Sequence, residues 1–266
     1  MKTTFFVLAF SVPLAVTGAP LTKSTFTQVV NDVDVISSGT QKASPAKLQS
    51  IVEAPNSVRT GGRSRAELTA PDSTITRVGS NTVFSFTSAG REYNLKKGSL
   101  LFQSPKGKGG GTIRSGGASA AVLGTTLMVA ATPDGGFKVI MLEGRGKVVL
   151  PNGKSVILKA GQMVFVLPNG QGFSGVITIR LGNLVAGSLL VNGFSNPLPS
   201  MPLIQAAVEK QERLIASGGA TDTGQSVDQI KDARVVPLID SISRQAVIHP
   251  PIKRGPNDIE DDVPSP

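Results

Sequence analysis

The chain has 266 residues, a formal net charge of +9, many glycines and prolines, few aromatic residues and no cysteine. Its length suffices for one or two domains, and the absence of cysteine excludes disulfides, thiolate metal sites and cysteine nucleophiles. Numerous glycines and prolines between short apolar runs favour β-structure with frequent turns over a helical bundle.

The first residues have the order of a secretory signal peptide. Lys2 gives a positive start, residues 5–16 are almost wholly apolar, and small residues follow at positions 17–19. We therefore interpret residues 1–19 as a signal peptide and expect the remainder to be exported, to the periplasm or the extracellular space. A buried N-terminal strand and an uncleaved membrane anchor are the alternatives.

The rest of the chain has no obvious membrane span and an uneven distribution of charge. Its next most apolar run, residues 176–191, is interrupted by Arg180, Asn183 and two glycines, so no transmembrane helix is expected after signal cleavage. Residues 57–108 carry nine bases and three acids, whereas residues 218–266 carry eight acids and five bases. A basic body could attract an anionic polymer, an anionic membrane surface or an acidic protein face, although exported proteins are often basic without such a partner. We expect no nucleic-acid partner.

Residues 26–170 are interpreted as a β-domain. The run at residues 26–36 alternates as a strand, residues 37–47 are polar and predict a loop, and turn signals then recur, mostly every eight or nine residues. This spacing is typical of a β-sandwich, barrel or solenoid rather than of βαβ units. Residues 137–142 and 163–167 are apolar on both faces, which predicts strands that are covered on both sides.

Two features give this domain further detail. Asn152-Gly153 and Asn169-Gly170 suit tight hairpin turns, because Asn and Gly tolerate the positive φ that such turns need. Residues 58–68 (VRTGGRSRAEL) and residues 113–123 (IRSGGASAAVL) are similar, at an offset of 114 − 59 = 55 positions. We interpret the similarity as an internal repeat of strand, glycine turn and strand, in which each unit buries its apolar face against its neighbour.

The pattern changes after residue 170. Residues 181–191 fit one face of a helix, and residues 203–216 give the clearest helix in the chain, with Ser200 as candidate N-cap. We therefore expect residues 171–217 to be a short helical appendage. Residues 218–266 are polar and unpatterned, which predicts a disordered tail.

Four phrases, in order, resemble the FecR family of bacterial cell-envelope proteins. They are VRTG with SRAEL at residues 58–68, LKKGSLL at residues 95–101, Gly124-Thr125 before a strand, and MLEG at residues 141–144 with LKAGQ at residues 158–162. The resemblance covers residues 53–166. It implies an all-β, sandwich-like or solenoid-like domain outside the cytoplasm.

Members of that family typically couple an outer-membrane receptor to a cytoplasmic sigma factor, through an N-terminal cytoplasmic segment and one membrane helix. In this chain the only membrane-competent stretch is the signal peptide, so no direct contact with a sigma factor is expected. What the resemblance implies here is an envelope domain for sensing or binding.

The sequence shows no recognisable set of catalytic residues. His249 is the only histidine and is followed by two prolines, which gives no rigid Ser-His-Asp site and too few ligands for zinc. The segment GKGGGT at residues 107–112 lacks the spacing of a phosphate loop, and residues 258–262 lack that of a calcium loop. Five carboxylates of the β-domain show no telling arrangement: Glu67, Asp72, Glu92, Asp134 and Glu143. No catalytic, cofactor-binding or metal-binding residue is therefore predicted.

Basic side chains near the two similar segments are the candidates for binding an anion or a partner: Arg59, Arg63, Arg65, Arg114, Lys106 and Lys108. The alternative is a solvated strand edge, where charges discourage unwanted strand pairing. Three functions follow. The first is a non-enzymatic exported domain that binds a protein or glycan of the cell envelope, with signal sensing as a possible role. The others are a structural or surface-layer spacer and an exported hydrolase that uses carboxylates.

Overall fold

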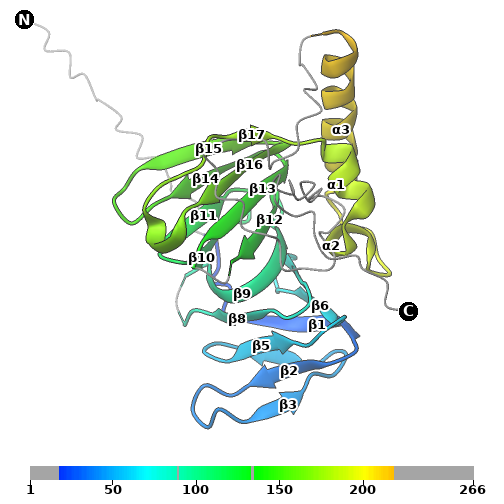
Figure 1. Ribbon diagram of the computed structural model, residues 1–266. Coiled ribbons are helices and arrows are strands. Elements are labelled where there is room, and N and C mark those ends of the chain that lie inside the picture. Colours follow the sequence, from blue (N-terminus) through cyan, green and yellow to red (C-terminus); the bar gives the residue numbers. More distant parts are fainter. Residues whose placement is uncertain (1–17, 89, 133–134, 219–266) are drawn as a thin grey trace, which may run out of the picture.

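The computed structural model describes residues 18–88, 90–132 and 135–218, which form two β-sheets with helices against one of them (Figure 1). The all-β fold class predicted from the turn spacing is confirmed. Most of the predicted signal peptide, nearly all of the predicted tail, His249 and Asp134 lie outside the described residues. No helix of the described ranges is both long and apolar enough to span a bilayer.

Sheet A is antiparallel between every pair of neighbours. Its order is β4 (Ile51–Glu53), β1 (Lys23–Val30), β6 (Arg65–Thr69), β7 (Ile75–Val78), β9 (Glu92–Gln103), β12 (Thr126–Ala131), β13 (Phe137–Glu143), β16 (Gln162–Val166) and β17 (Ile177–Thr178).

Sheet B is also antiparallel, except that β9 and β10 run parallel. Its order is β3 (Ala43–Pro45), β2 (Val33–Ile36), β5 (Ser57–Thr60), β8 (Val83–Phe86), β9, β10 (Gly111–Ser115), β11 (Ala118–Val122), β14 (Arg145–Val149) and β15 (Ser155–Lys159).

Strand β9 belongs to both sheets. Its first half pairs with β8 and β10 in sheet B, and its second half pairs with β7 and β12 in sheet A. Gly98 lies at the change of sheet with φ of +84°, and a Cβ there would come within 2.5 Å of the Thr82 Cα. Only glycine fits this corner without strain.

Apolar side chains fill the space between the sheets and also cover the outer face of sheet A. The inner cluster includes Phe26, Phe84, Tyr93 and Phe102, whose side chains are buried. A second cluster joins sheet A to α1 (Leu181–Gly187), α2 (Leu189–Asn192) and α3 (Met201–Ala216). Strands β13 and β16 are therefore covered on both faces, which confirms the prediction made from their apolar runs.

The two predicted hairpin turns are present. Asn152-Gly153 joins β14 to β15, and Gly153 donates its N–H to the Leu150 carbonyl. Asn169 and Gly170 have φ of +58° and +66° in the short 3-10 helix η1 (Pro168–Gly170), which leads β16 back to a bridge between Val166 and Phe173.

Several local details differ from the sequence-based interpretation. The predicted loop at residues 37–47 contains β3, and the single helix expected at residues 181–191 is broken at Ser188 into α1 and α2. Ser200 does precede α3, but its hydroxyl is hydrogen-bonded to the Thr126 hydroxyl at 2.7 Å and does not cap the helix.

The two similar segments also follow different paths. After β5 the chain leaves sheet B and enters sheet A as β6, whereas β10 and β11 form a hairpin within sheet B. Gly116 and Gly117 have φ of +53° and +82°, which permits a two-residue hairpin. Gly61 and Gly62 do not have positive φ, and Arg63 (φ of +55°) takes the left-handed position instead. The similarity in sequence therefore does not correspond to one repeated geometry.

Candidate functional site

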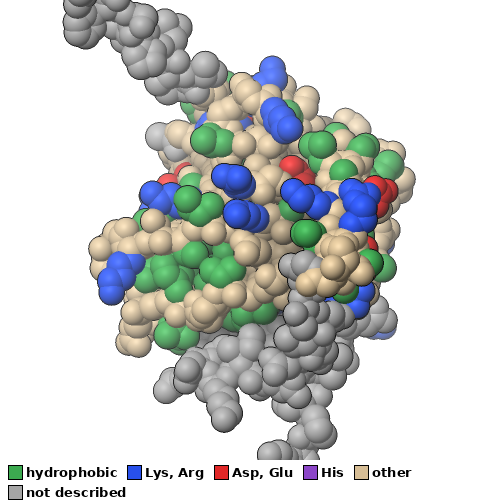
Figure 2. Space-filling model, turned by 90° about the horizontal axis from the view of Figure 1, so that it is seen from above, with side chains coloured by type: hydrophobic (Ala, Val, Ile, Leu, Met, Phe, Trp, Pro, Cys, Tyr) green, Lys and Arg blue, Asp and Glu red, His purple; other side chains and the backbone are tan. Residues whose placement is uncertain are grey.

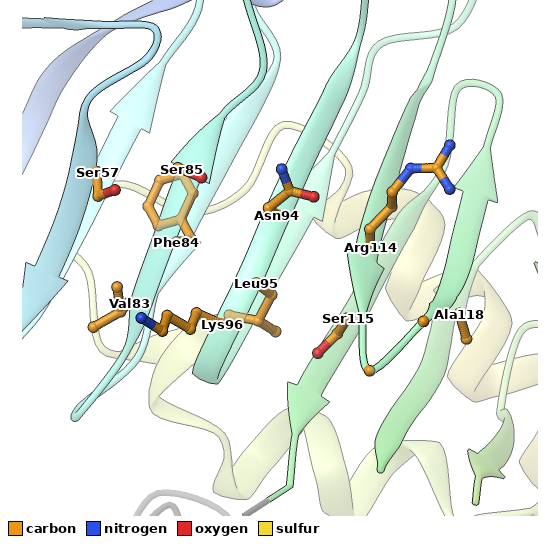
Figure 3. A pocket seen from close by; sticks show the side chains of 12 residues that line it. Ser57, Val83, Phe84, Ser85, Asn94, Leu95, Lys96, Arg114, Ser115 and Ala118 are labelled. Atoms are coloured by element: carbon orange, nitrogen blue, oxygen red, sulfur yellow. The ribbon is translucent and has the colours of Figure 1, made fainter. Parts of the chain in front are cut away.

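An open hollow of about 470 Å³ lies on the outer face of sheet B, the face directed away from the core. Figure 3 shows its lining, which comes from β5, β8, β9, β10, the turn before β11 and the first residue of β11. The hollow forms because β9 pairs with β10 only as far as Asn94, while β9 continues beside β8 to Lys97 before it crosses to sheet A. The parallel pair thus separates, and space opens between Lys96 and the Gly116-Gly117 turn.

Lys96 occupies an irregular position in this lining. The register places Phe84 opposite Leu95 but Val83 opposite Lys97, so Lys96 is the extra residue of a β-bulge. A bulge turns its residue out of the normal alternation and can direct it toward a site. Lys96 is exposed, and in Figure 3 its side chain extends toward Val83 on β8.

The charges around the hollow leave it positive. Arg114 lines the hollow, but it forms an ion pair with Glu92 at 2.6 Å, and this carboxylate balances its charge. Lys96 makes no ion pair with any residue in the described ranges, and no acid lines the hollow. Ser57, Ser85 and Asn94 add side-chain donors and acceptors nearby. The arrangement suits an anionic or polyhydroxylated group.

The six basic residues singled out in the sequence do not form one site. Arg59 on β5 and Arg114 on β10 are separated by β8 and β9, which corresponds to about 14 Å at the usual strand spacing. Arg59 pairs with Asp34 on β2, and this contact raises its pKa. Of the six, only Arg114 lines the hollow.

The other four lie elsewhere. Arg63 is exposed in the connection between β5 and β6, and Lys106 and Lys108 lie in the connection between β9 and β10. Arg65, on β6, donates to the Gly193 carbonyl at 2.5 Å. It therefore holds the segment after α2 against sheet A.

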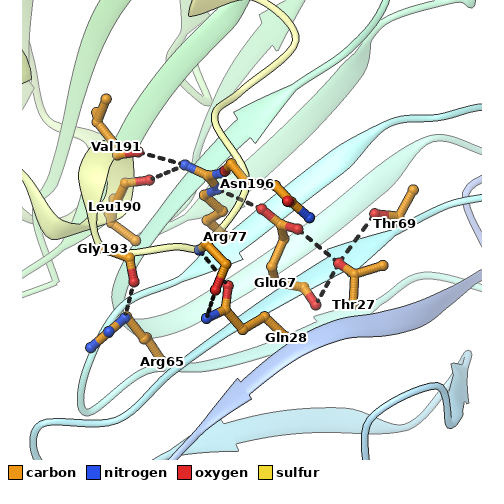
Figure 4. A network of polar contacts seen from close by, with 11 residues as sticks. Thr27, Gln28, Arg65, Glu67, Thr69, Arg77, Leu190, Val191, Gly193 and Asn196 are labelled. Atoms are coloured by element: carbon orange, nitrogen blue, oxygen red, sulfur yellow. Dashed lines mark hydrogen bonds and ion pairs between the residues drawn. The ribbon is translucent and has the colours of Figure 1, made fainter.

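A buried network next to Arg65 centres on Arg77, whose side chain is fully buried on β7 (Figure 4). Its Nε donates to the Glu67 carboxylate at 2.8 Å. The remaining donors reach the backbone carbonyls of Leu190, Val191 and Asn196 at 3.2, 2.7 and 2.5 Å. Burial lowers the pKa of Arg77, and the Glu67 carboxylate opposes that shift.

This network accounts for one of the carboxylates considered for hydrolysis. Glu67 also accepts a hydrogen bond from the Thr27 hydroxyl at 2.9 Å, and the Phe194 ring lies 4.5 Å from the Arg77 guanidinium. The side chains are engaged with one another and buried. Their role is to fasten the helical segment to sheet A.

The other described carboxylates are also engaged separately. Asp72 pairs with Arg91 at 2.6 Å, and Glu143 accepts from Thr126 at 3.1 Å. Burial raises the pKa of Glu143. No two of these acids are joined as a catalytic pair in the contacts of the described residues. Those residues also hold no group of three His, Asp or Glu side chains that could bind a metal ion.

The sequence analysis did not single out Lys96 as a candidate binding residue, although Lys96 lies in the LKKGSLL phrase at residues 95–101. The bulge depends on how β9 pairs with β8, and this pairing is not visible from Lys96 and its neighbours alone. Gly98, two residues later, was the one available signal, because a glycine after two lysines marks a bend.

Comparison with known proteins places this site within a recognised domain. Residues 56–148 match the FecR protein family, and no protein of curated function matches the chain. Two crystal structures of a "putative anti-sigma factor" from Parabacteroides distasonis ATCC 8503 are similar, each at 20% sequence identity. The first covers 49% of this chain and 63% of its own, with a TM-score of 0.43; the second covers 59% and 73%, with a TM-score of 0.41. This chain therefore spans less than two thirds of the first structure. The match over residues 56–148 lies within the predicted resemblance at residues 53–166 and shows that the chain contains a FecR domain.

Proposed function

We propose that this protein is a non-enzymatic, exported binding protein of the cell envelope, which recognises an acidic protein or glycan through the hollow on sheet B. The observation that carries the proposal is the unpaired Lys96 at the bulge, in a lining without acids. An ammonium group without a partner gives an anionic ligand both attraction and orientation.

The surrounding face supports this assignment. Its other exposed cations include Lys97, Arg145, Lys147 and Lys159, and they share the outer side of sheet B with Lys96. A face of one sign raises the local concentration of an oppositely charged partner and speeds association. A role in signal sensing is part of the proposal, and its support is the FecR domain.

The first experiment is cross-linking and recovery of partners from envelope extracts with three forms of the protein. Wild type and Lys210→Glu, a control at an exposed lysine on α3, should recover the same partner, and Lys96→Glu should lose it. Because surface charges are screened by salt, recovery should fall between about 0.05 and 0.5 M salt. Recovery of the partner by all three forms would show that the hollow is not the binding surface.

Export is tested separately. We expect the protein in the periplasm or medium of a producing cell to begin at or near residue 20, as read by mass spectrometry of its N-terminal peptide. A protein that keeps residues 1–19 and stays in the cytoplasm would refute the envelope location, whatever the hollow binds.

A further inference from the structure

Strand β15 forms an edge of sheet B that no described strand covers. It pairs with β14 on one side, and its Lys159 N–H, on the other side, is taken by the Gln162 side chain at 2.9 Å. Alternation along the strand places the N–H and C=O of Ile157 on that same free edge. Ile157 is 61% exposed, so an apolar side chain lies beside unpaired backbone groups. Such an edge is a template for another strand.

The opposite edge of sheet B is better protected. Strand β3 has only three residues and ends at Pro45, which cannot donate to a neighbouring strand. β15 has five residues and no proline. Figure 2, which looks onto the end of the molecule where β15 and β17 lie, shows hydrophobic side chains gathered among lysines and arginines.

The charged side chains that line this edge on β14 and β15 are all basic. Arg145 on β14 lies directly opposite Lys159 on β15, and Lys147 lies opposite Ile157. The three cations are exposed and form no ion pair within the described ranges. Like charges directly opposite each other on a sheet are destabilising. An anionic strand at this edge would remove that repulsion.

One segment of this chain has the matching pattern. Residues 258–263 read DIEDDV, with four acids in five positions. In an extended conformation Asp258, Glu260 and Asp262 share one face, and Ile259, Asp261 and Val263 share the other. The acidic face matches the cations of β14 and β15, and the apolar residues match the half-buried Val156 on the inner side of β15.

The last described helix passes close to the turn that follows β15. Gln211 on α3 donates to the Ile179 carbonyl at 2.8 Å, and a Cβ on Gly161, in the turn after β15, would lie 2.7 Å from its Nε2. Asp258 follows Gly218 by 258 − 218 = 40 positions, which can span up to about 130 Å. Reach is therefore sufficient, and a tethered segment acts at an effective concentration of about a millimolar.

We infer that residues 258–263 add to β15 as a further strand of sheet B, held by their acids against Arg145, Lys147 and Lys159. The tail then neutralises the positive charge of β14 and β15, and an acidic partner that extends along the outer face of sheet B to these strands competes with it. The docking itself does not depend on the proposed function, because it is read from the edge and the tail alone.

The test is hydrogen exchange of the full-length protein, read on peptides that cover β15. Neutralising the acidic face of the segment by Asp258→Asn, Glu260→Gln and Asp262→Asn, with Asp261 on the other face left in place, should speed exchange in β15 at least tenfold. The matched control neutralises three acids earlier in the tail, by Asp222→Asn, Asp228→Asn and Asp232→Asn, and should leave exchange unchanged. A synthetic peptide of residues 257–263, added to the neutralised protein, should restore protection.

The same measurement can overturn the inference. Equal exchange in wild type and in the neutralised protein would show that the segment does not cover β15. Protection that rises with protein concentration and survives neutralisation would assign the edge to a second copy of the chain. Because the substitutions lie outside the described fold, a loss of folding is not expected, and circular dichroism of each variant checks this.

Discussion

Replacing Arg77 with methionine gives the sharpest test of how the helical segment is held. Methionine keeps much of the volume of the side chain but removes the charge and every donor. Glu67, which is itself buried, then keeps only the Thr27 hydroxyl, and three backbone carbonyls of residues 190–196 lose their donor. The substitution therefore leaves a buried charge without its partner.

The magnitude follows from these contacts. Removing one partner of a buried ion pair costs about 3–5 kcal/mol. Each lost hydrogen bond to a carbonyl adds roughly 1 kcal/mol, unless water replaces it. Since a domain is stable by only about 5–15 kcal/mol, Arg77→Met should lower the free energy of unfolding by a large fraction of the total.

Urea unfolding, followed by circular dichroism, measures this loss, with Arg65→Met as the matched control. Arg65 makes one carbonyl contact at the same segment, so its replacement should cost about 1 kcal/mol. The double change Glu67→Leu with Arg77→Met removes the orphaned carboxylate and should recover about 2 kcal/mol or more relative to Arg77→Met. A loss below about 1 kcal/mol for Arg77→Met would refute the reasoning.

The remaining predictions concern two titrating groups and one glycine. Tyr93 is the only tyrosine, and burial raises its pKa to about 12, so absorbance at 295 nm should show ionisation near pH 12 in the folded protein and near pH 10 in urea; a folded midpoint near 10 would contradict its burial. Because burial raises the pKa of Glu143, its effect on stability is most favourable below its ordinary pKa of 4.5 and is lost as pH rises through the raised value. Glu143→Gln should therefore stabilise the protein at pH 7 but not at pH 4, as read by melting temperature. Gly98→Ala should destabilise the protein by roughly 2–6 kcal/mol, from positive φ and from the clash with Thr82, and an unchanged urea midpoint would exclude this geometry.

Much of the fold could be predicted from local patterns. The turns at Asn152-Gly153 and Asn169-Gly170 and the strands that are apolar on both faces depend on neighbours in sequence, and the structure has them. The clearest predicted helix, at residues 203–216, is α3 except for its first two residues.

Other features depend on partners that are distant in sequence. Arginine is usually found at the surface, and the carbonyl groups that accept from Arg77 lie 113–119 positions further along the chain. Nothing near Arg77 in the sequence therefore predicted that its side chain is buried. Arg59 and Arg114 look equivalent in sequence, but the chain changes sheet after one and reverses within a sheet after the other. The position of Lys96 in the hollow likewise depends on how β9 pairs with β8 and β10, and the sequence around Lys96 does not reveal this pairing.

The membership of β9 in both sheets has a consequence for how the molecule comes apart. Neither sheet can lose its central strand without removing the same covalent segment from the other, so the layers are coupled mechanically as well as by packing. Heating is therefore expected to melt both layers in a single cooperative transition, and calorimetry would reveal one peak for a body built from two stacked layers.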